Sequence, residues 1–148
     1  NIFAVSGVLM RFRAMKKAGD LARISWQLYL ECKMQEINFD WIRGDDETET
    51  LIFTDDDNTP VDFTDCHFDC DIVPVSKGER IRLSSTNGSI LVKNNEVTLI
   101  ISHDKTEQAD WVQAKWDLQQ TNGQGLVKTL CGGKITLRKD ITYDVSQR

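Results

Sequence analysis

Several features are scarce in this chain of 148 residues, and each scarcity removes a class of protein. It contains only 2 prolines and 9 glycines and no short repeat, which excludes collagen-like, solenoid and low-complexity architectures. No run of about 18 uncharged apolar residues occurs, so no membrane span is expected. Four cysteines are too few for a small domain built on disulfides, which a chain of this length does not need.

What remains is the composition of one globular domain, with 40% hydrophobic and 28% charged residues and a net charge of −5. The charge is unevenly distributed. Residues 1–35 carry six Lys or Arg against two acids, and residues 36–148 carry twelve against twenty-one. A basic segment beside an acidic body suits an anionic partner or an acidic neighbouring subunit. No dense block of like charges occurs, which argues against nucleic-acid binding.

The segment from Val8 to Met34 has the periodicity of an amphipathic helix, and no proline interrupts it. Gly19 allows either one helix or two helices with a bend, because glycine costs about 1 kcal/mol relative to alanine inside a helix. Residues 1–35 are therefore assigned as a basic helical extension, whose apolar side we expect to contact a partner. The residues expected to make that contact are Leu9, Phe12, Met15, Leu21, Ile24 and Leu28.

After Met34 the pattern changes to short alternating stretches separated by turn residues, which is typical of an antiparallel β domain. Turn sequences such as 55–60 and 86–88 recur at the spacing expected of a β-sandwich. The predicted strands are 37–42, 49–54, 66–72, 81–83, 89–92, 97–101, 111–118, 126–130 and 133–137, with a brief helical turn at 106–110.

Several fragments in this order resemble one known family. They are residues 41–45, 54–64, 87–90, 116–119, 129–137 and 140–142. Together they resemble the immunoglobulin-like domain at the start of baseplate upper proteins and related phage tail proteins, over residues 36–144. Asn58 stands where that family often has glycine, and Trp116 where it usually has tyrosine. Both changes keep the physics, because asparagine tolerates a left-handed turn and tryptophan buries a similar ring.

The resemblance implies an immunoglobulin-like antiparallel β-sandwich for residues 36–148, without catalytic residues or a cofactor. It also implies a non-enzymatic structural subunit of a phage tail, baseplate or fibre attachment point that works through protein–protein contacts. The expected partners are other virion tail subunits and further copies of the chain itself, and neither nucleic acid nor membrane. No export signal is expected, because basic residues break the apolar run near the start. The expected location is the virion, assembled in the bacterial host cytoplasm.

The residues themselves offer little for metal binding or catalysis. Strand alternation sends His67 to the opposite face from Cys66 and Cys70, so no zinc site is predicted. The acidic run at 55–57 lacks the ligand spacing of a calcium-binding EF-hand loop. With two histidines and no Gly-x-Ser-x-Gly motif, a Ser–His–Asp triad is not expected either.

A carbohydrate- or cell-surface-binding module is the alternative function, and it depends on exposed aromatic side chains. Trp41 and Trp116 fall at strand positions that are expected to fill the core. Trp111, beside Asp110, is the tryptophan that we expect to be available for a sugar or for a partner subunit. The Arg43-Gly44-Asp45 sequence is interpreted as a strand corner and not as a cell-adhesion signal.

Overall fold

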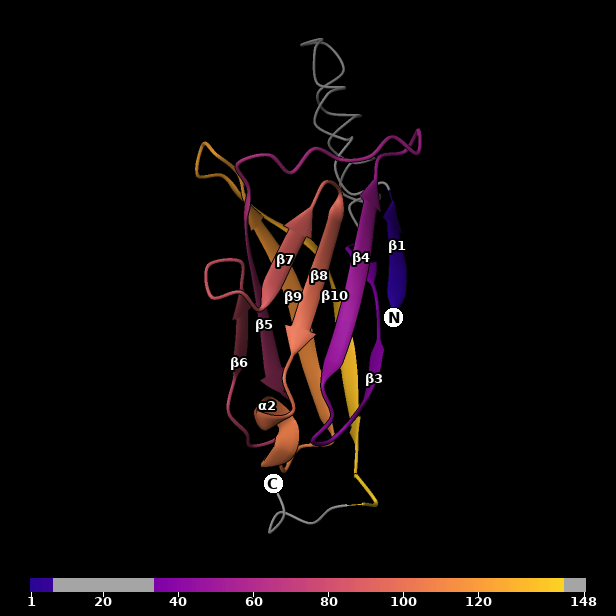
Figure 1. Cartoon of the computed structure of the whole chain (residues 1–148), viewed down its shortest axis with the longest axis vertical. Coiled ribbons are helices and arrows are strands. Elements are labelled where there is room, and N and C mark those ends of the chain that lie inside the picture. Colours follow the sequence, from indigo (N-terminus) through magenta and orange to yellow (C-terminus); the bar gives the residue numbers. More distant parts are fainter. Residues whose placement is uncertain (7–33, 143–148) are drawn as a thin grey trace, which may run out of the picture.

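The computed structural model describes residues 1–6 and 34–142, which form strands joined by turns and one short helix (Figure 1). The elements are β1 (Ile2–Ser6), β2 (Gln35–Glu36), β3 (Phe39–Ile42), β4 (Glu47–Thr54), β5 (His67–Pro74), β6 (Ile81–Ser84), β7 (Ile90–Lys93), β8 (Glu96–Ile101), α2 (Asp104–Glu107), β9 (Gln113–Thr121) and β10 (Val127–Arg138). The described part of the chain is therefore mainly β, as predicted.

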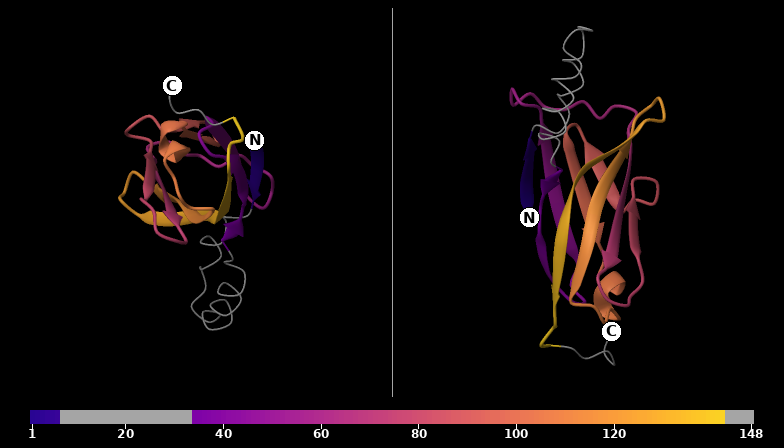
Figure 2. Two further views of the ribbon diagram at one scale, coloured as in Figure 1. Left: turned by 90° about the horizontal axis from the view of Figure 1, so that it is seen from below. Right: turned by 180° about the vertical axis from the view of Figure 1, so that it is seen from behind.

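Two sheets face each other across one core (Figures 1 and 2). The four-stranded sheet has the order β1-β4-β8-β7. The six-stranded sheet has the order β2-β10-β9-β5-β6, and β3 also pairs with β10. This arrangement agrees with the predicted β-sandwich, while the finer immunoglobulin-like assignment stays a prediction.

The prediction of purely antiparallel sheets is wrong at three strand pairs. Strand β1 runs parallel to β4, and both β2 and β3 run parallel to β10. The remaining pairs are antiparallel. Parallel neighbours cannot be joined by a hairpin, so these pairings connect segments far apart in the chain and leave no local turn signal.

Strand β1 belongs to the sandwich, although it comes before the domain boundary predicted after residue 35. Its residues pair with Thr50–Thr54 of β4, Val5 is fully buried, and Ile2 is exposed. The assignment of residues 1–35 to a helical extension is therefore wrong for this strand, because five alternating residues carry little weight beside the long helical periodicity that follows. The helix predicted over residues 8–33 lies outside the described residues.

Side-chain alternation predicted most of the other strands. In β5, Phe68, Cys70 and Ile72 face the core, as expected. The stretches 126–130 and 133–137, predicted as two strands, instead belong mostly to the single strand β10, whose register against β9 shifts between Thr129 and Cys131. The predicted helical turn at 106–110 begins earlier, as α2.

Aromatic side chains fill the core in two groups. Phe39 stacks on Trp41 and on Trp116, with ring centroids 5.7 and 4.7 Å apart. Trp41 is 1% and Trp116 is 4% exposed, which confirms that both fill the sandwich. The second group, in edge-to-face contact, is Phe53, Phe63 and Phe68.

Two glycines let the strands on either side of β10 approach it closely. A Cβ atom on Gly133 would lie 2.0 Å from the carbonyl oxygen of Ile37, and one on Gly132 would lie 2.5 Å from that of Trp116. At the kink between β2 and β3, the Ile37 amide donates to the Gly132 carbonyl at 2.8 Å. The Ile37 carbonyl accepts from Trp116 Nε1 at 2.9 Å. A side chain at Gly133 would therefore push β2 and β3 away from β10, whereas one at Gly132 would push against β9.

The expected turns are present and use the expected residues. Asp55 Oδ1 accepts the amide hydrogens of Asp57 and Thr59 at 2.8 and 2.9 Å. Asn58, in the same turn, has a φ of 60°, so asparagine does adopt the left-handed conformation here. Asn94, with a φ of 56°, lies in the two-residue turn between β7 and β8.

Candidate functional site

Of the residues predicted to contact a partner, Leu9, Phe12, Met15, Leu21, Ile24 and Leu28 lie outside the described residues. Trp111 is the one that the structure places, directly before β9. Its side chain is 2% exposed.

The connection after β5 covers Trp111. A Cβ atom on Gly78 would lie 3.0 Å from Trp111 Cδ1 and 2.8 Å from Pro74 Cγ, so this connection passes directly over the indole. The expectation that the Trp111 side chain is exposed is therefore wrong, and its contact with a partner subunit stays a prediction. The carbohydrate-binding alternative loses the residue on which it depended.

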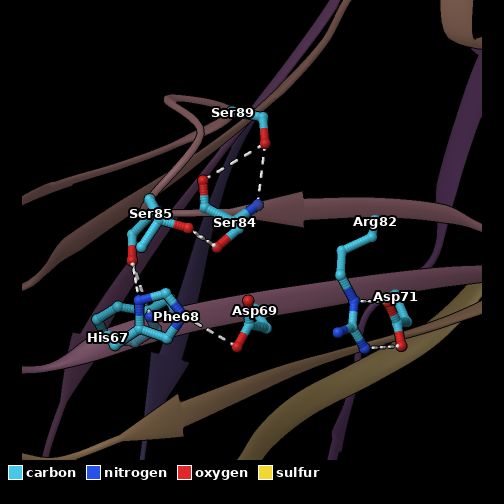
Figure 3. Close-up of polar contacts among 9 residues, drawn as sticks. His67, Phe68, Asp69, Asp71, Arg82, Ser84, Ser85 and Ser89 are labelled. Atoms are coloured by element: carbon cyan, nitrogen blue, oxygen red, sulfur yellow. Dashed lines mark hydrogen bonds and ion pairs between the residues drawn. The ribbon is translucent and has the colours of Figure 1, made fainter.

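The outer face of the six-stranded sheet carries charges of both signs, and we call it the charged face. Asp71 on β5 is the register partner of Arg82 on β6 and of Asp117 on β9. Arg82 donates to both carboxylate oxygens of Asp71 at 2.7 Å (Figure 3). Arg80 adds a contact at 3.3 Å. The hydrogen bonds from Arg82 lower the pKa of Asp71 below its ordinary value.

The neighbouring Asp117 is shifted in the opposite direction. Burial raises the pKa of its carboxyl group, and the negative charge of Asp71 raises it further. Arg82 and Arg80 therefore favour the ionised form of Asp71, whereas the ionised form of the adjacent Asp117 is disfavoured.

A Ser–His–Asp cluster lies farther along the same face (Figure 3). His67 Nδ1 is 2.8 Å from Ser85 Oγ, and His67 Nε2 is 3.0 Å from Asp69 Oδ2. This cluster differs from the expectation that the chain has no Ser–His–Asp triad. Two signals could have revealed it, since His67 and Asp69 share a face by alternation and hairpin register brings Ser85 next to β5.

The geometry of this cluster suits a structural role better than catalysis. Ser85 Oγ also accepts the amide hydrogen of Phe68 at 3.1 Å, so the hydroxyl joins β5 to the end of β6. His67 and Asp69 are about one-third exposed, at 36% and 32%. Neither of the two grooves that adjoin this face is lined by His67, Asp69 or Ser85.

Two grooves adjoin the charged face. One, of about 490 Å³, lies over β9 and β10 and is lined by Glu36, Asp71, Lys115 and Lys134 among others. The other, of about 640 Å³, lies between the β5–β6 connection and α2. Its lining includes Lys77, Glu79, Arg80, Asp104, Lys105 and Asp110. Both grooves mix cations with anions, so neither has the single-sign lining that would select a charged ligand.

The outer face of the four-stranded sheet differs sharply in composition. One row of register partners crosses all four strands, from Ile2 through Thr50 and Thr98 to Leu91. Ile2 is 74% and Leu91 is 54% exposed. Among the outward-facing residues described in this sheet, charge is confined to the cross-strand pair of Lys93 and Glu96. The uncharged outward-facing residues are Ile2, Ala4, Thr48, Thr50, Ile52, Thr54, Leu91, Thr98 and Ile100, and we call them the neutral face.

The four-stranded sheet keeps a further charge inside. Glu49 on β4 is fully buried, and its Oε1 accepts the Trp41 Nε1 hydrogen at 2.8 Å. Its Oε2 has no hydrogen-bond partner among the described residues. Burial of a carboxylate is costly without hydrogen bonds, so the contact with Trp41 is important for stability.

The described cysteines are free thiols. Cys70 and Cys131 flank Leu118 from its two neighbouring strands, which places them roughly 10 Å apart, twice the strand spacing and too far for a disulfide. Burial raises the pKa of both thiols, that of Cys131 to about 12. Within residues 1–6 and 34–142, no group of three or more potential ligands is placed to hold a metal ion.

No helix within residues 1–6 and 34–142 is long and apolar enough to cross a bilayer.

Comparison with known proteins finds a likeness in fold. No family model and no curated protein matches this chain. Among solved structures, the N-terminal domain of ORF48 of phage TP901-1 aligns with 94% of this chain and 100% of its own length. The TM-score is 0.51 and the sequence identity is 8%. The fold is therefore shared with a phage protein domain, and at this identity the likeness concerns the fold alone.

Proposed function

We propose that this chain is a structural subunit of a phage tail, baseplate or fibre attachment point, and that it works through protein–protein contacts and not as an enzyme. The likeness to the N-terminal domain of a phage protein, over the whole of that domain, is the observation that carries this proposal. The resemblance of residues 36–144 to the immunoglobulin-like domain of baseplate upper proteins points in the same direction. The virion is the corresponding location.

Two surfaces would make the contacts. The basic segment of residues 8–33 is proposed to present its apolar side to another tail subunit and its basic side to an acidic surface. The β-sandwich is proposed to contact further copies of this chain. No contact is assigned to the charged face, because the Asp71 carboxylate there already pairs with Arg82 and Arg80 within the chain.

The first test removes the segment and keeps the sandwich. Because Gln35 Nε2 donates to the Ala4 carbonyl at 3.0 Å, the chain on either side of the segment is close together, and a short Gly/Ser linker can replace residues 8–33 without removing β1. The variant should unfold in urea like the full chain but no longer enter the particle. Incorporation at the normal level would contradict the proposed role of the segment.

A substitution in the full chain gives a finer test. Ile24→Asp places a charge on the side of the predicted helix that carries Leu21 and Leu28, whereas Ala22→Asp places the same charge on the opposite side. Incorporation should fall strongly for Ile24→Asp and little for Ala22→Asp. Equal losses would show that the apolar side has no special part in assembly.

A further inference from the structure

Within residues 1–6 and 34–142, the edge of the four-stranded sheet at β7 has backbone hydrogen-bonding groups without partners. Lys93 and Glu96 flank the two-residue turn, so this pair exchanges backbone hydrogen bonds, and so does the pair of Leu91 and Thr98. The Ile100 amide donates to the Ser89 carbonyl at 2.8 Å, in agreement with this alternation. The amide and carbonyl groups of Ile90 and Val92 therefore point away from β8, toward the open edge.

Other edges of the sandwich are partly closed within the chain. On β6, the Ser84 amide donates to Ser89 Oγ at 2.9 Å, and Ser89 Oγ donates to the Ser84 carbonyl at 3.4 Å (Figure 3). On β1, the Ala4 carbonyl accepts from Gln35. Strand β7 instead combines two unpaired backbone positions with Leu91, an exposed apolar side chain at the end of the neutral face. Natural proteins usually cover, charge or pair such an edge.

We propose that a second copy of this chain binds at β7, so that the two β7 strands pair antiparallel about a two-fold axis at Leu91. This register places Ile90 of each copy opposite Val92 of the other, which pairs the backbone groups that are free in both. Leu91 then meets Leu91 of the second copy. Lys93 lies opposite Ser89, so no like charges are brought together.

The same two-fold symmetry also brings together two matching features on either side of β7, a groove and an exposed turn. A groove of about 490 Å³, lined by Val92, Asn94 and Asn95 together with residues 60–64 and Cys66, adjoins the end of the strand. The uncharged turn of residues 86–88 is exposed just before its beginning. Antiparallel pairing carries the turn of one copy toward the groove of the other. The neutral face becomes continuous across the axis, and its rows of threonine and aliphatic residues bring no unpaired charge into the contact.

This inference rests on the proposed function, since it locates the self-association that the function includes, but its test uses purified full-length protein. The two can therefore fail separately. If deletion of residues 8–33 blocks incorporation while the β7 contact is absent in solution, the subunit function stands and this interface is wrong.

Cysteine cross-linking tests the register, in a full-length background with Cys32 and Cys66 changed to serine. Leu91→Cys places two thiols directly opposite each other in a non-hydrogen-bonded pair, where the Cα separation of roughly 4.5 Å suits a disulfide. Lys93→Cys is the matched control, because its two thiols lie four residues apart along the paired strands, roughly 14 Å. Leu91→Cys should form disulfide-linked dimers at least about tenfold faster than Lys93→Cys. Equal rates, or no cross-linking of Leu91→Cys, would overturn the proposal.

Sedimentation supplies a second measurement that does not depend on thiol chemistry. Leu91→Lys brings two positive charges together at the axis and should abolish the concentration-dependent dimer of the parent chain. Thr48→Lys puts the same charge on the exposed neutral face away from the axis and should keep that dimer. A parent chain that stays monomeric, or a dimer that survives Leu91→Lys, counts against the β7 interface.

Discussion

The two outer faces of this sandwich use polar residues in different ways. On the six-stranded sheet, Asp71 is held by Arg82 and Arg80, and Asp40 is held by Arg138 at 2.7 Å. On the four-stranded sheet, the outward side chains are mainly threonine and aliphatic residues, and the polar contact between strands is the Thr50–Thr98 hydroxyl pair at 3.1 Å. One face is therefore strongly hydrated, and the other loses little when water leaves it.

This difference indicates where a partner can bind at low cost. A partner on the charged face must remove water from several ions that already have partners within the chain, and new contacts rarely recover that desolvation. A partner on the neutral face removes water from hydroxyl and methyl groups only. The comparison therefore favours the four-stranded sheet for subunit contact and the six-stranded sheet as the face that stays in solvent.

The largest effect on stability is expected at the edge of the six-stranded sheet that β2 and β3 form beside β10. Gly133→Ala would place a Cβ atom 2.0 Å from the Ile37 carbonyl oxygen, so β2 and β3 must move away from β10. We expect the free energy of unfolding, measured by urea denaturation, to fall by about 3 kcal/mol or more. Gly123→Ala is the control, since its nearest neighbour is the Asp65 Cβ atom at 3.3 Å. A Gly133→Ala variant as stable as the Gly123→Ala variant would mean that the edge is not packed as described.

The next effect concerns the charge that the four-stranded sheet keeps inside. Trp41→Phe removes the Nε1 donor that lies 2.8 Å from Glu49 Oε1, and it leaves the fully buried carboxylate without that bond. The free energy of unfolding should fall by about 2 to 3 kcal/mol, beyond what the smaller ring alone costs.

A double mutant separates the lost hydrogen bond from the lost volume. In a Glu49→Leu background the carboxylate is gone, so Trp41→Phe should then cost clearly less than in the parent chain. Equal costs in the two backgrounds would show that the hydrogen bond to Glu49 contributes nothing.

A smaller and pH-dependent effect is expected on the charged face. Because Arg82 lowers the pKa of Asp71 in the folded chain, the ionised carboxylate stabilises the fold above its unfolded pKa of about 3.9. That contribution is lost as the pH falls through the lower, folded-state value. Asp71→Asn should therefore cost about 1 kcal/mol at pH 7, and the difference from the parent chain should vanish in strong acid. Urea denaturation of both proteins at several pH values measures this difference in the free energy of unfolding.

Asp117→Asn provides the control of opposite sign on the same face. The pKa of Asp117 is raised, so its carboxylate opposes folding once the pH exceeds the folded-state value. Its replacement should increase stability at pH 7 by a few tenths of a kcal/mol, because solvent screens this partly exposed group. A loss of stability at pH 7 would show that the two carboxylates do not repel each other.

Local pattern in the sequence was enough to predict the strands with one buried face. The alternation in β5 separated Phe68 and Cys70 from Asp69 and Asp71, and the acidic turn at 55–60 was predicted from residues that bond their own backbone. Both depend on interactions within a few residues, which is why sequence analysis found them.

The remaining features depend on pairings between distant segments. The parallel contact of β1 with β4 joins residues that are 48 positions apart, and no turn marks it. Trp111 was placed wrongly because the connection at Gly78, more than thirty residues earlier, covers it. The neutral face follows the same rule, because Ile2, Thr50 and Leu91 form a row only once the order of the strands is known.

The smallest effect is expected from the hydroxyl pair of the neutral face. Thr50→Val keeps the shape of the side chain and removes the hydrogen bond between Thr50 Oγ1 and Thr98 Oγ1. Because water can reach the remaining Thr98 hydroxyl, we expect the free energy of unfolding to fall by only about 0.5 kcal/mol. Urea denaturation of this variant, beside Thr50→Val with Thr98→Val, measures the pair. If the sheet depended on this contact, Thr50→Val would lower the free energy of unfolding several times more. The side chains of the neutral face would then be needed to hold the strands together, and would not be free to contact a partner in place of water.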